Sequence, residues 1–291
     1  MAGQGEEAPS NPISDCFEMQ FMSLSFREQL TDCDQYKLAS VFMEWLPSRQ
    51  PFLEAGCGSG RWVAWFISKG WNAVGLDWSE ALCQRARQEV PCARFESGDF
   101  RNMPFRDHEF GSIVALGSVE HSIEGPVAAL REFHRVLRPG GIAIITVPNG
   151  GPLRKLSRLA KTPVRSVKSW QWLRQVLGKA GAKGRSMREA RRRAVSAWQP
   201  DFACGQDGWY FYEYNFTERQ FRGFLREAGF SILEAFAEFP EEGLIHNFGK
   251  LAGSYDPAGT GLSLTSLGRA VLRLLPASYL GHMVCFIARR D

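Results

Sequence analysis

A glycine-rich turn between a strand-like run and a helix-like run constrains the fold of this chain more than any other feature. Residues 52–55 form a short apolar run, Gly56, Gly58 and Gly60 follow it, and helical periodicity begins at Arg61. Such glycines let the backbone approach a ligand closely, and the N-terminus of the following helix favours a negatively charged group. A tight turn that binds nothing is the alternative. Because residue 61 is Arg, the dinucleotide pattern G-x-G-x-x-G is not completed.

The alternation of apolar and helical-period stretches continues along the chain and predicts an α/β fold. Further apolar runs lie at residues 73–76, 93–96, 112–116 and 142–147. Helical-period stretches separate them at residues 61–68, 80–89 and 127–137. This spacing is typical of right-handed crossovers and a parallel sheet, so we expect a Rossmann-like, doubly wound architecture.

Breakers interrupt the alternation at residues 148–152, and it resumes near Asn215. Thr217 and Gln220 match a capping box, which predicts a helix to about residue 228. Strands are then expected at residues 230–239 and 282–288, which brings the number of predicted strands to seven. An irregular stretch, residues 240–280, separates these two strands and contains one expected amphipathic helix at residues 264–275.

Four regions follow from this pattern. Residues 1–34 are expected to be an N-terminal arm, mobile over about the first thirty residues and leading into a helix at about residues 31–45. Residues 35–149 form the expected core, and residues 150–212 a basic helical insertion. Residues 213–291 complete the core and contain the second insertion, at about residues 240–280.

Composition excludes several classes of protein. The seven cysteines are scattered, odd in number and contain no C-x-x-C pair, so we expect reduced thiols in a cytoplasmic protein and neither a zinc nor a redox site. Residues 1–11 lack the basic and apolar regions of a secretory signal. No apolar run approaches the ~18 residues of a membrane-spanning helix.

An acid and an aromatic residue end the second predicted strand. The Asp77 carboxylate can accept hydrogen bonds from both ribose hydroxyls of an adenosine ligand. Trp78 offers a flat face to adenine. The alternative role for Asp77 is to cap the helix that begins near Glu80, and the two roles are compatible.

With these residues, the chain resembles the class I S-adenosylmethionine (SAM)-dependent methyltransferases, in particular the type 11 subfamily of small-molecule enzymes. Residues 53–60 resemble the first motif of that family, Asp77 its ribose-binding acid, and residues 96–100 its adenine loop. Residues 103–105, 119–121 and 137–141 resemble the later motifs in order and spacing. The resemblance covers about residues 35–149 and 213–239, together with the last strand.

The resemblance implies a seven-stranded sheet that is mostly parallel with an antiparallel last strand, helical lid insertions, and SAM as cofactor. Glu54 and the glycine turn would face the methionine part, Asp77 and Trp78 the ribose and adenine, and residues 116–118 the sulfonium. Asp99 and Phe100 would meet the adenine edge. The cofactor-binding residues that the resemblance implies are Glu54, Ala55, Gly56, Cys57, Gly58, Gly60, Asp77, Trp78, Asp99, Phe100, Leu116 and Gly117.

Two positions depart from patterns in this family. The family usually has Asp at position 111, where this chain has Gly, and we expect the change to affect loop anchoring more than cofactor binding. Some ubiquinone-pathway O-methyltransferases that resemble this region carry an extra Glu three residues before the Glu-His pair and bind a divalent metal. This chain has Gly117 there, so we expect no metal site.

The candidate catalytic residues are His121, Glu120 and Tyr212. His121 follows the fourth predicted strand, and its ordinary pKa of about 6.5 suits a general base. The alternative is that Glu120 and His121 only organise the loop. Tyr212 belongs to an aromatic run, residues 209–214, that either lines the acceptor pocket, where a tyrosine can assist proton transfer, or packs as a strand against the sheet.

The insertion is strongly basic, because residues 150–200 hold fourteen Lys and Arg against the single acid Glu189. Apolar residues recur at helical spacing over residues 153–177, and Pro163 is expected to split them into two helices. A substrate lid is one interpretation. A second is peripheral contact with an anionic membrane through residues 153–193, with Trp170 and Trp172 on the docking face.

A third interpretation places the arginines at 191–193 on RNA phosphates, although no RNA-binding motif accompanies them and nucleic acid is not an expected partner. Our hypothesis is therefore a methyltransferase acting on an O or N atom of a small-molecule or lipid-like acceptor. The alternatives are a catalytically silent scaffold with the same fold, or an RNA-directed methyltransferase. A NAD-dependent oxidoreductase is disfavoured, because the third dinucleotide glycine is missing.

Overall fold

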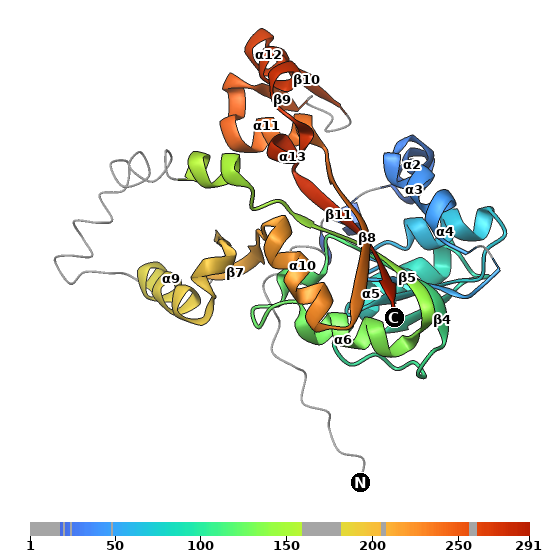
Figure 1. Ribbon diagram of the computed structural model, residues 1–291. Helices are drawn as coiled ribbons and strands as arrows, with labels where there is room; N and C mark the ends of the chain where they lie inside the picture. Colours follow the sequence, from blue (N-terminus) through green and yellow to red (C-terminus); the bar gives the residue numbers. More distant parts are fainter. Residues whose placement is uncertain are drawn as a thin grey trace.

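A seven-stranded sheet runs through the centre of the computed structural model, which describes residues 18–19, 21–23, 25–47, 49–158, 182–204, 208–255 and 261–291 (Figure 1). The strand order is β3-β2-β1-β4-β5-β11-β8. Strands β1 to β5 pair in parallel, whereas β11 runs antiparallel to both β5 and β8. The strands are β1 (Phe52–Ala55), β2 (Ala73–Asp77), β3 (Arg94–Ser97), β4 (Phe110–Leu116), β5 (Leu137–Pro148), β8 (Phe230–Glu238) and β11 (Met283–Arg290). The predicted α/β fold, with its seven strands and antiparallel last strand, is confirmed.

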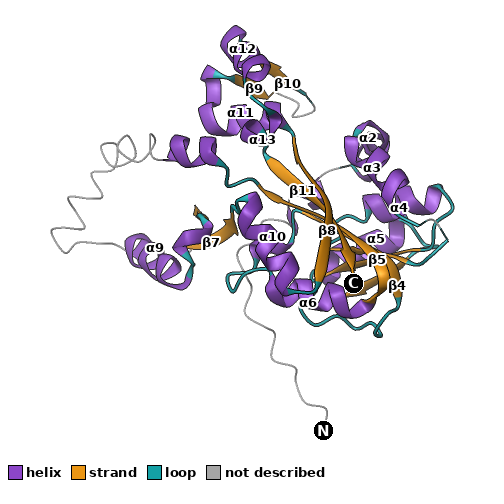
Figure 2. Cartoon of the chain, in the orientation of Figure 1, coloured by secondary structure: helices purple, strands orange, loops and turns teal. Residues whose placement is uncertain are grey.

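Helices cover both faces of this sheet (Figure 2). On one face, α6 and α10 contribute to a large apolar core. On the other face, α3, α4 and α5 build a second core that is rich in aromatic residues. The helices of these two layers are α3 (Lys37–Trp45), α4 (Arg61–Ser68), α5 (Glu80–Glu89), α6 (Val127–Val136) and α10 (Glu218–Glu227).

Local sequence accounts for the ends of these helices. Thr217 caps α10, and its side chain and that of Gln220 form the predicted capping box. Ser79 caps α5 by accepting a hydrogen bond from the amide of Leu82 at 3.2 Å. Both helices therefore begin where a side chain satisfies a backbone amide that the helix leaves without a partner.

The parallel strands end at one edge of the sheet, and the loops after β1, β2, β3 and β4 all lie there. In open α/β sheets this edge binds ligands where the strand order reverses, which here is between β1 and β4. The loop after β4 contains a short 3-10 helix, η2 (Val119–His121). The topology thus gathers the glycine turn, Asp77, Asp99 and His121 at one place.

The N-terminal region differs from the expected mobile arm. Residues 18–19 and 21–23 are helical, and α2 (Phe26–Asp32) packs against α4 with Phe26 and Gln29 buried. A 3-10 turn, η1 (Cys33–Gln35), separates α2 from α3, where one continuous helix was expected. The Ser59 hydroxyl donates a hydrogen bond to Gln29 Oε1 at 2.8 Å, which ties this region to the glycine turn. Residues 1–17 lie outside the described residues.

The first insertion follows β5. Residues 152–158 are helical, and α9 (Ala182–Arg193), η3 (Ser196–Trp198) and the antiparallel pair β6 (Pro200–Cys204) and β7 (Trp209–Tyr214) lead back to the core. The expected pair of helices split by Pro163, including Trp170 and Trp172, lies mostly outside the described residues.

The second insertion is more regular than expected. Its single predicted helix corresponds to α12 (Ser266–Leu274), but four more short elements precede it among the described residues. Pro240, where the expected irregular stretch begins, occupies the first turn of α11, where proline fits a helix. The remaining elements are α11 (Pro240–Phe248), η4 (Gly249–Leu251), β9 (Gly253–Tyr255), β10 (Leu262–Leu264) and α13 (Ala277–Leu280). In the described parts of the chain, no helix is long and apolar enough to cross a membrane.

Candidate active site

A cavity of about 770 Å³ opens at the edge of the sheet where the parallel strands end. Pockets for small ligands commonly have volumes of about 300–1,000 Å³. Eight of the twelve expected cofactor residues line it, and so does His121. The eight are Gly56, Gly58, Asp77, Trp78, Asp99, Phe100, Leu116 and Gly117.

The other expected residues lie behind this surface. Glu54, Ala55, Cys57 and Gly60 do not line the cavity, and neither do Glu120 and Tyr212. Glu54 is 3 % exposed, and its Oε2 has no hydrogen-bond partner within the described chain. Burial raises the pKa of Glu54 to about 8, against the opposing effect of Arg61. Its carboxyl is therefore buried behind the surface of the cavity.

The glycine turn needs glycine at Gly56 for two reasons. Its φ of +81° lies in the left-handed region, and a Cβ there would lie 2.7 Å from Cβ of Ser118. The Gly56 amide also donates a hydrogen bond to the carbonyl of Leu76 at 2.8 Å. The loops after β1 and β4 therefore approach each other too closely for any side chain at residue 56.

Asp77 is fixed by two backbone amides. Its carboxylate accepts hydrogen bonds from Gly58 at 2.8 Å and from Ser79 at 3.0 Å. Burial raises the pKa of Asp77, and these amides oppose the rise. Because Ser79 is the cap of α5, the helix-capping alternative for Asp77 is not observed. A carboxylate has about four acceptor sites, so Asp77 keeps acceptor capacity on the cavity side.

Asp99 is held by a neighbouring guanidinium rather than lying open. Arg101 donates hydrogen bonds to both Asp99 oxygens at 2.7 to 3.0 Å and reaches Glu124 at 3.3 Å. Partial burial acts to raise the pKa of Asp99, but Arg101 holds it below its ordinary value. All three side chains line the cavity, so any contact of Asp99 with an adenine edge would share the carboxylate with Arg101.

His121 is oriented by the aromatic run. Its Nδ1 lies 2.7 Å from the carbonyl oxygen of Tyr212, and because a carbonyl only accepts, Nδ1 carries the proton. The Tyr212 ring packs edge-on against the imidazole at 5.3 Å between centroids. Burial lowers the pKa of His121, while the backbone of Tyr212 and Gly117 opposes the change.

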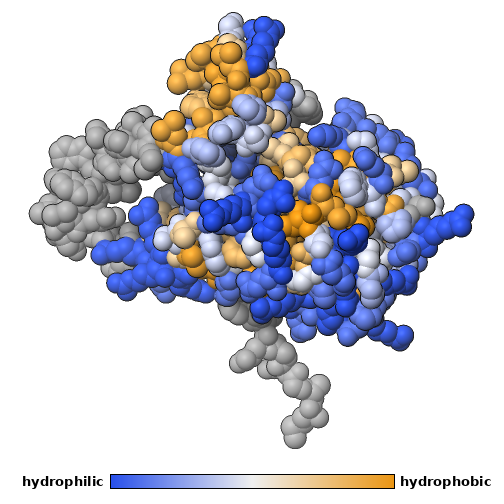
Figure 3. All heavy atoms as spheres, viewed as in Figure 1, coloured by the Kyte–Doolittle hydropathy of each residue, from blue (hydrophilic) through white to orange (hydrophobic). Residues whose placement is uncertain are grey.

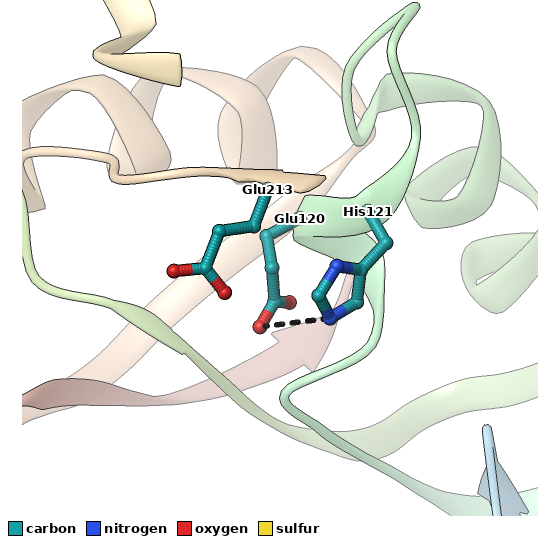
Figure 4. Close-up of side chains that lie close together, drawn as sticks. All are labelled: Glu120, His121 and Glu213. Atoms are coloured by element: carbon teal, nitrogen blue, oxygen red, sulfur yellow. Dashed lines mark ion pairs between the residues drawn. The ribbon is translucent and has the colours of Figure 1, made fainter. Parts of the chain in front are cut away.

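Two carboxylates lie beside this imidazole (Figure 4). Glu120 Oε1 is 4.0 Å from His121 Nε2, and Glu213 extends from β7 so that ligand atoms of all three residues lie within 4.8 Å of one another. Glu120 is 1 % exposed, and its Oε2 has no hydrogen bond within the described chain. Burial and then Glu213 raise the pKa of Glu120 well above its ordinary value.

Glu213 belongs to a buried charge network that sequence reasoning missed. The guanidinium of Arg154, on the helix after β5, is 5 % exposed and lies 3.7 Å from Glu213 and 3.2 Å from Asp201. Burial raises the pKa of Glu213 to about 7, although Arg154 acts to lower it. The only sequence signal was that Glu213 is the one acid within the aromatic run at residues 209–214.

The aromatic run forms the expected strand, and three of its residues also line the cavity. It forms β7, which pairs with β6, and Phe211 is buried in the core. Trp209, Tyr210 and Phe211 also line the cavity. From α9, Ser186, Glu189, Ala190 and Arg193 complete the same wall. The described part of the basic insertion therefore contributes directly to the cavity.

Two further features fall outside the sequence predictions. Phe21 lines the cavity, and a Cβ on Gly58 would lie 3.1 Å from its ring. Glu18 accepts a hydrogen bond from the Ser79 hydroxyl at 3.0 Å, so the N-terminal segment covers the glycine turn. At Gly111, where the family usually has Asp, the side chain of Gln50 packs on the glycine and occupies the space that a Cβ would take.

Comparison with known proteins agrees with this geometry. Residues 53–145 match a family model described as a methyltransferase domain. A malonyl-[acyl-carrier protein] O-methyltransferase from Erwinia pyrifoliae is 36 % identical over 110 residues, which cover 36 % of this chain and 40 % of that protein. A demethylmenaquinone methyltransferase from Chlorobaculum parvum is 34 % identical over 102 residues, which cover 34 % of this chain and 42 % of that protein. The chain thus spans about two fifths of the length of these curated relatives.

The fold is also found among solved structures. The crystal structure of a SAM-dependent methyltransferase from Methanosarcina mazei superimposes with a TM-score of 0.55 and 15 % identity, and the match covers 86 % of this chain and 96 % of that one. The fold, the family match and the motifs at the strand ends agree with one another. Residues 53–145 are therefore a methyltransferase domain of the class I SAM-dependent family, whose cofactor is S-adenosylmethionine, and the chain as a whole has the fold of that family.

Proposed function

We propose that this protein binds SAM in the cavity and transfers its methyl group to an O or N atom of a small-molecule or lipid-like acceptor. The observation that carries the proposal is that one cavity joins the strand ends of the sheet to the aromatic and basic residues of the insertion. Its volume of about 770 Å³ has room for a nucleoside cofactor and a second small molecule.

The residues at the sheet edge fit the cofactor. Gly56 and Gly58 leave backbone exposed to the cavity, Asp77 has acceptor sites for ribose hydroxyls, and Trp78 is 46 % exposed and can stack on adenine. Leu116 and Gly117 provide the floor on the side of β4. The exposed backbone, the carboxylate and the aromatic ring are the groups that a ligand with a zwitterionic tail, a diol and a flat base needs.

The acceptor would lie toward the insertion. Trp209, Tyr210 and Phe211 offer apolar and aromatic surface, and Arg193 adds a positive charge. This lining suits an acceptor that combines an apolar body with an anionic group. The two curated relatives are named for malonyl-[acyl-carrier protein] and for demethylmenaquinone, and a lipid-like acceptor here is consistent with those names.

When bound, SAM supplies an activated methyl group on its sulfonium. The main task of the protein is then to align the acceptor, and orientation of this kind can contribute ~7–11 kcal/mol. A hydroxyl acceptor must also lose a proton, and His121 is the side chain placed to take it. Because the Tyr212 carbonyl holds the proton on Nδ1, the imidazole accepts a second proton at Nε2, and the backbone of Gly117 favours the protonated ring.

Isothermal titration calorimetry tests the cofactor assignment. The full chain is titrated with SAM, S-adenosylhomocysteine (SAH) and NADH, alongside Asp77→Asn and the matched control Asp107→Asn, an exposed acid outside the cavity. We expect micromolar Kd values for SAM and SAH and no binding of NADH. Because hydrogen bonds to a charged group contribute about 1.5–3 kcal/mol, Asp77→Asn should weaken both about 10- to 100-fold and Asp107→Asn should not.

The alternatives have distinct outcomes in this experiment. A folded chain that binds neither SAM nor SAH is the catalytically silent scaffold. Binding of NADH alone would contradict the family assignment. If SAM binds, SAH release is measured with candidate acceptors that carry a hydroxyl, a carboxyl or an amine on an apolar body.

A further inference from the structure

Exposed hydrophobic side chains gather on one end of the molecule, formed by the second insertion (Figure 3). Of the fifteen large hydrophobic side chains that are exposed among the described residues, eight lie between residues 248 and 279. We call residues 240–255 and 261–280 the apolar lobe. Leu251, Leu267 and Leu274 in this lobe are 70 %, 61 % and 79 % exposed. Apolar residues scattered singly are ordinary on a surface, whereas a contiguous group marks a binding surface.

The apolar lobe has its own small core, so these side chains are not displaced core residues. Leu244, Ala252 and Leu280 are buried together, and Val271 packs against them from α12. Gly268 seats α12 closely, since a Cβ there would lie 2.2 Å from the carbonyl oxygen of Ala252. The helix is thereby fixed with one face on the core and another face in solvent.

Two leucines lie on the exposed side of α12, where a soluble helix usually carries polar side chains. Leu267 and Leu274 are seven residues apart, which places them on the same face two turns from each other. Arg273 is exposed on the flank of that face, and Arg269 is exposed on the side of the helix away from it. An exposed apolar stripe with a basic flank is the pattern of a helix that lies in the interface of a membrane.

The charged residues next to two of the exposed leucines are basic, since Lys250 precedes Leu251 and Arg273 precedes Leu274. The described part of the apolar lobe contains no acid beyond Glu241 and Glu242, at the start of α11, and exposes Lys250, Arg269 and Arg273. The helix at residues 152–158 packs on the lobe core through Leu153 and exposes Leu156 at 61 %. That helix opens the insertion, whose residues 150–200 hold fourteen Lys and Arg against one acid. The helix that packs on the lobe core is therefore followed in the sequence by a strongly basic stretch.

We propose that the apolar lobe docks the protein on an anionic lipid membrane. Leu251, Leu267 and Leu274 would enter the headgroup region, while Arg273 and Lys250 would meet lipid phosphates. A second copy of the chain fits this surface less well, because an isologous contact would bring like charges together. The proposal is independent of cofactor binding, since the lobe does not line the cavity.

Vesicle co-sedimentation of the full chain tests it. Vesicles of phosphatidylcholine alone are compared with vesicles that contain phosphatidylglycerol, at low and high salt. We expect at least tenfold tighter binding to the anionic vesicles, weakened by salt. Leu267→Ser with Leu274→Ser should reduce this binding at least tenfold, and Met43→Ser, an exposed methionine on α3, should leave it unchanged. Arg273→Gln should reduce binding to anionic vesicles only.

SAM titration of the double-leucine variant, with its thermal unfolding, shows that it remains folded. The proposal is overturned if the wild-type chain binds neither kind of vesicle, or if the double-leucine variant binds anionic vesicles as tightly as the wild type. It is also overturned if analytical ultracentrifugation shows a wild-type dimer that the leucine substitutions dissociate, because the lobe would then be a surface for a second copy. If the chain does not bind SAM, thermal unfolding alone shows whether the variant is folded, and the vesicle and ultracentrifugation results keep the same meaning.

Discussion

The carboxylates of Glu120 and Glu213 lie close together beside the His121 imidazole, one from η2 and the other from β7. Two carboxylates this close in a buried place cannot both carry full charge without cost, and the pKa of each is raised. Arg154 compensates one of the two charges, since it lies 3.7 Å from Glu213. We expect the pair to hold a proton near neutral pH and to titrate as a unit.

The first prediction concerns stability and pH. The pKa of Glu213 is raised to about 7 by burial, so the folded state binds a proton that the unfolded chain releases near pH 4.5. The contribution of this protonated carboxyl to the free energy of unfolding is complete below about pH 4.5, and it is lost as pH rises through about 7. Glu213→Gln should therefore flatten the fall in Tm between pH 5 and pH 8, measured by thermal unfolding.

The control for this comparison is Glu218→Gln, an exposed acid that begins α10. Glu54 and Glu238 also have raised pKa values, so the wild-type slope has several contributors and only the difference between variants is informative. If Tm falls with pH equally steeply in Glu213→Gln and Glu218→Gln, the prediction that Glu213 holds a proton near neutral pH is wrong.

The second prediction concerns metal. Glu120, His121 and Glu213 have ligand atoms close enough for a cation, although Gly117 led us to expect no metal site. A proton on the carboxylate pair and the guanidinium of Arg154 already balance the charge there. We therefore expect chelator-treated protein to change its Tm by less than about 1 °C when Mg²⁺ or Mn²⁺ is added. A rise in Tm with Mn²⁺ that disappears in Glu213→Gln would instead establish a divalent site.

Sequence predicted the sheet and its ligand edge because the signals there are local. The glycine turn, Asp77 at the end of β2 and the capping box of Thr217 each depend on a few adjacent residues. The bounds of β1, α4 and α5 were predicted to the residue for the same reason. Periodicity and backbone chemistry determine these features without reference to the rest of the chain.

The rest of the site could not be predicted, because it depends on contacts between distant segments. Phe21 reaches Gly58, and Arg154 reaches Glu213, with no periodicity to mark either contact. The apolar lobe was also missed, because Gly243, Gly249 and Gly253 break the helical pattern of its elements. Such long-range pairings are determined by packing, which one sequence alone does not reveal.

The third prediction concerns catalysis by His121. Burial lowers its pKa, so the imidazole is neutral and able to accept a proton at neutral pH. Once an acceptor that must lose a proton is known, His121→Gln should lower kcat by about 10²- to 10⁴-fold and leave the Kd for SAH unchanged. The wild-type rate should be constant above pH 6.5 and fall at lower pH. A variant that loses SAH binding together with activity would indicate that His121 only organises the loop.

The fourth prediction concerns the N-terminal segment as a cover for the cofactor. The Phe21 ring lies over Gly58, and Arg85 fixes its backbone by donating a hydrogen bond to the Phe21 carbonyl at 2.7 Å. Burial of an aromatic side chain against a ligand contributes about 1.5–3 kcal/mol, so Phe21→Ala should weaken SAH binding on the order of tenfold, mainly through faster dissociation. Stopped-flow displacement of SAH measures this rate.

Met19→Ala is the matched control for Phe21→Ala, since Met19 lies in the same segment but is 71 % exposed. It should bind SAH as the wild type does. Tighter binding by Phe21→Ala would mean that the ring occupies part of the cofactor volume and must leave before SAM enters. The segment would then oppose binding, and a chain without residues 1–24 should also bind SAH more tightly. If the segment instead covers the bound cofactor, that truncated chain should bind SAH more weakly.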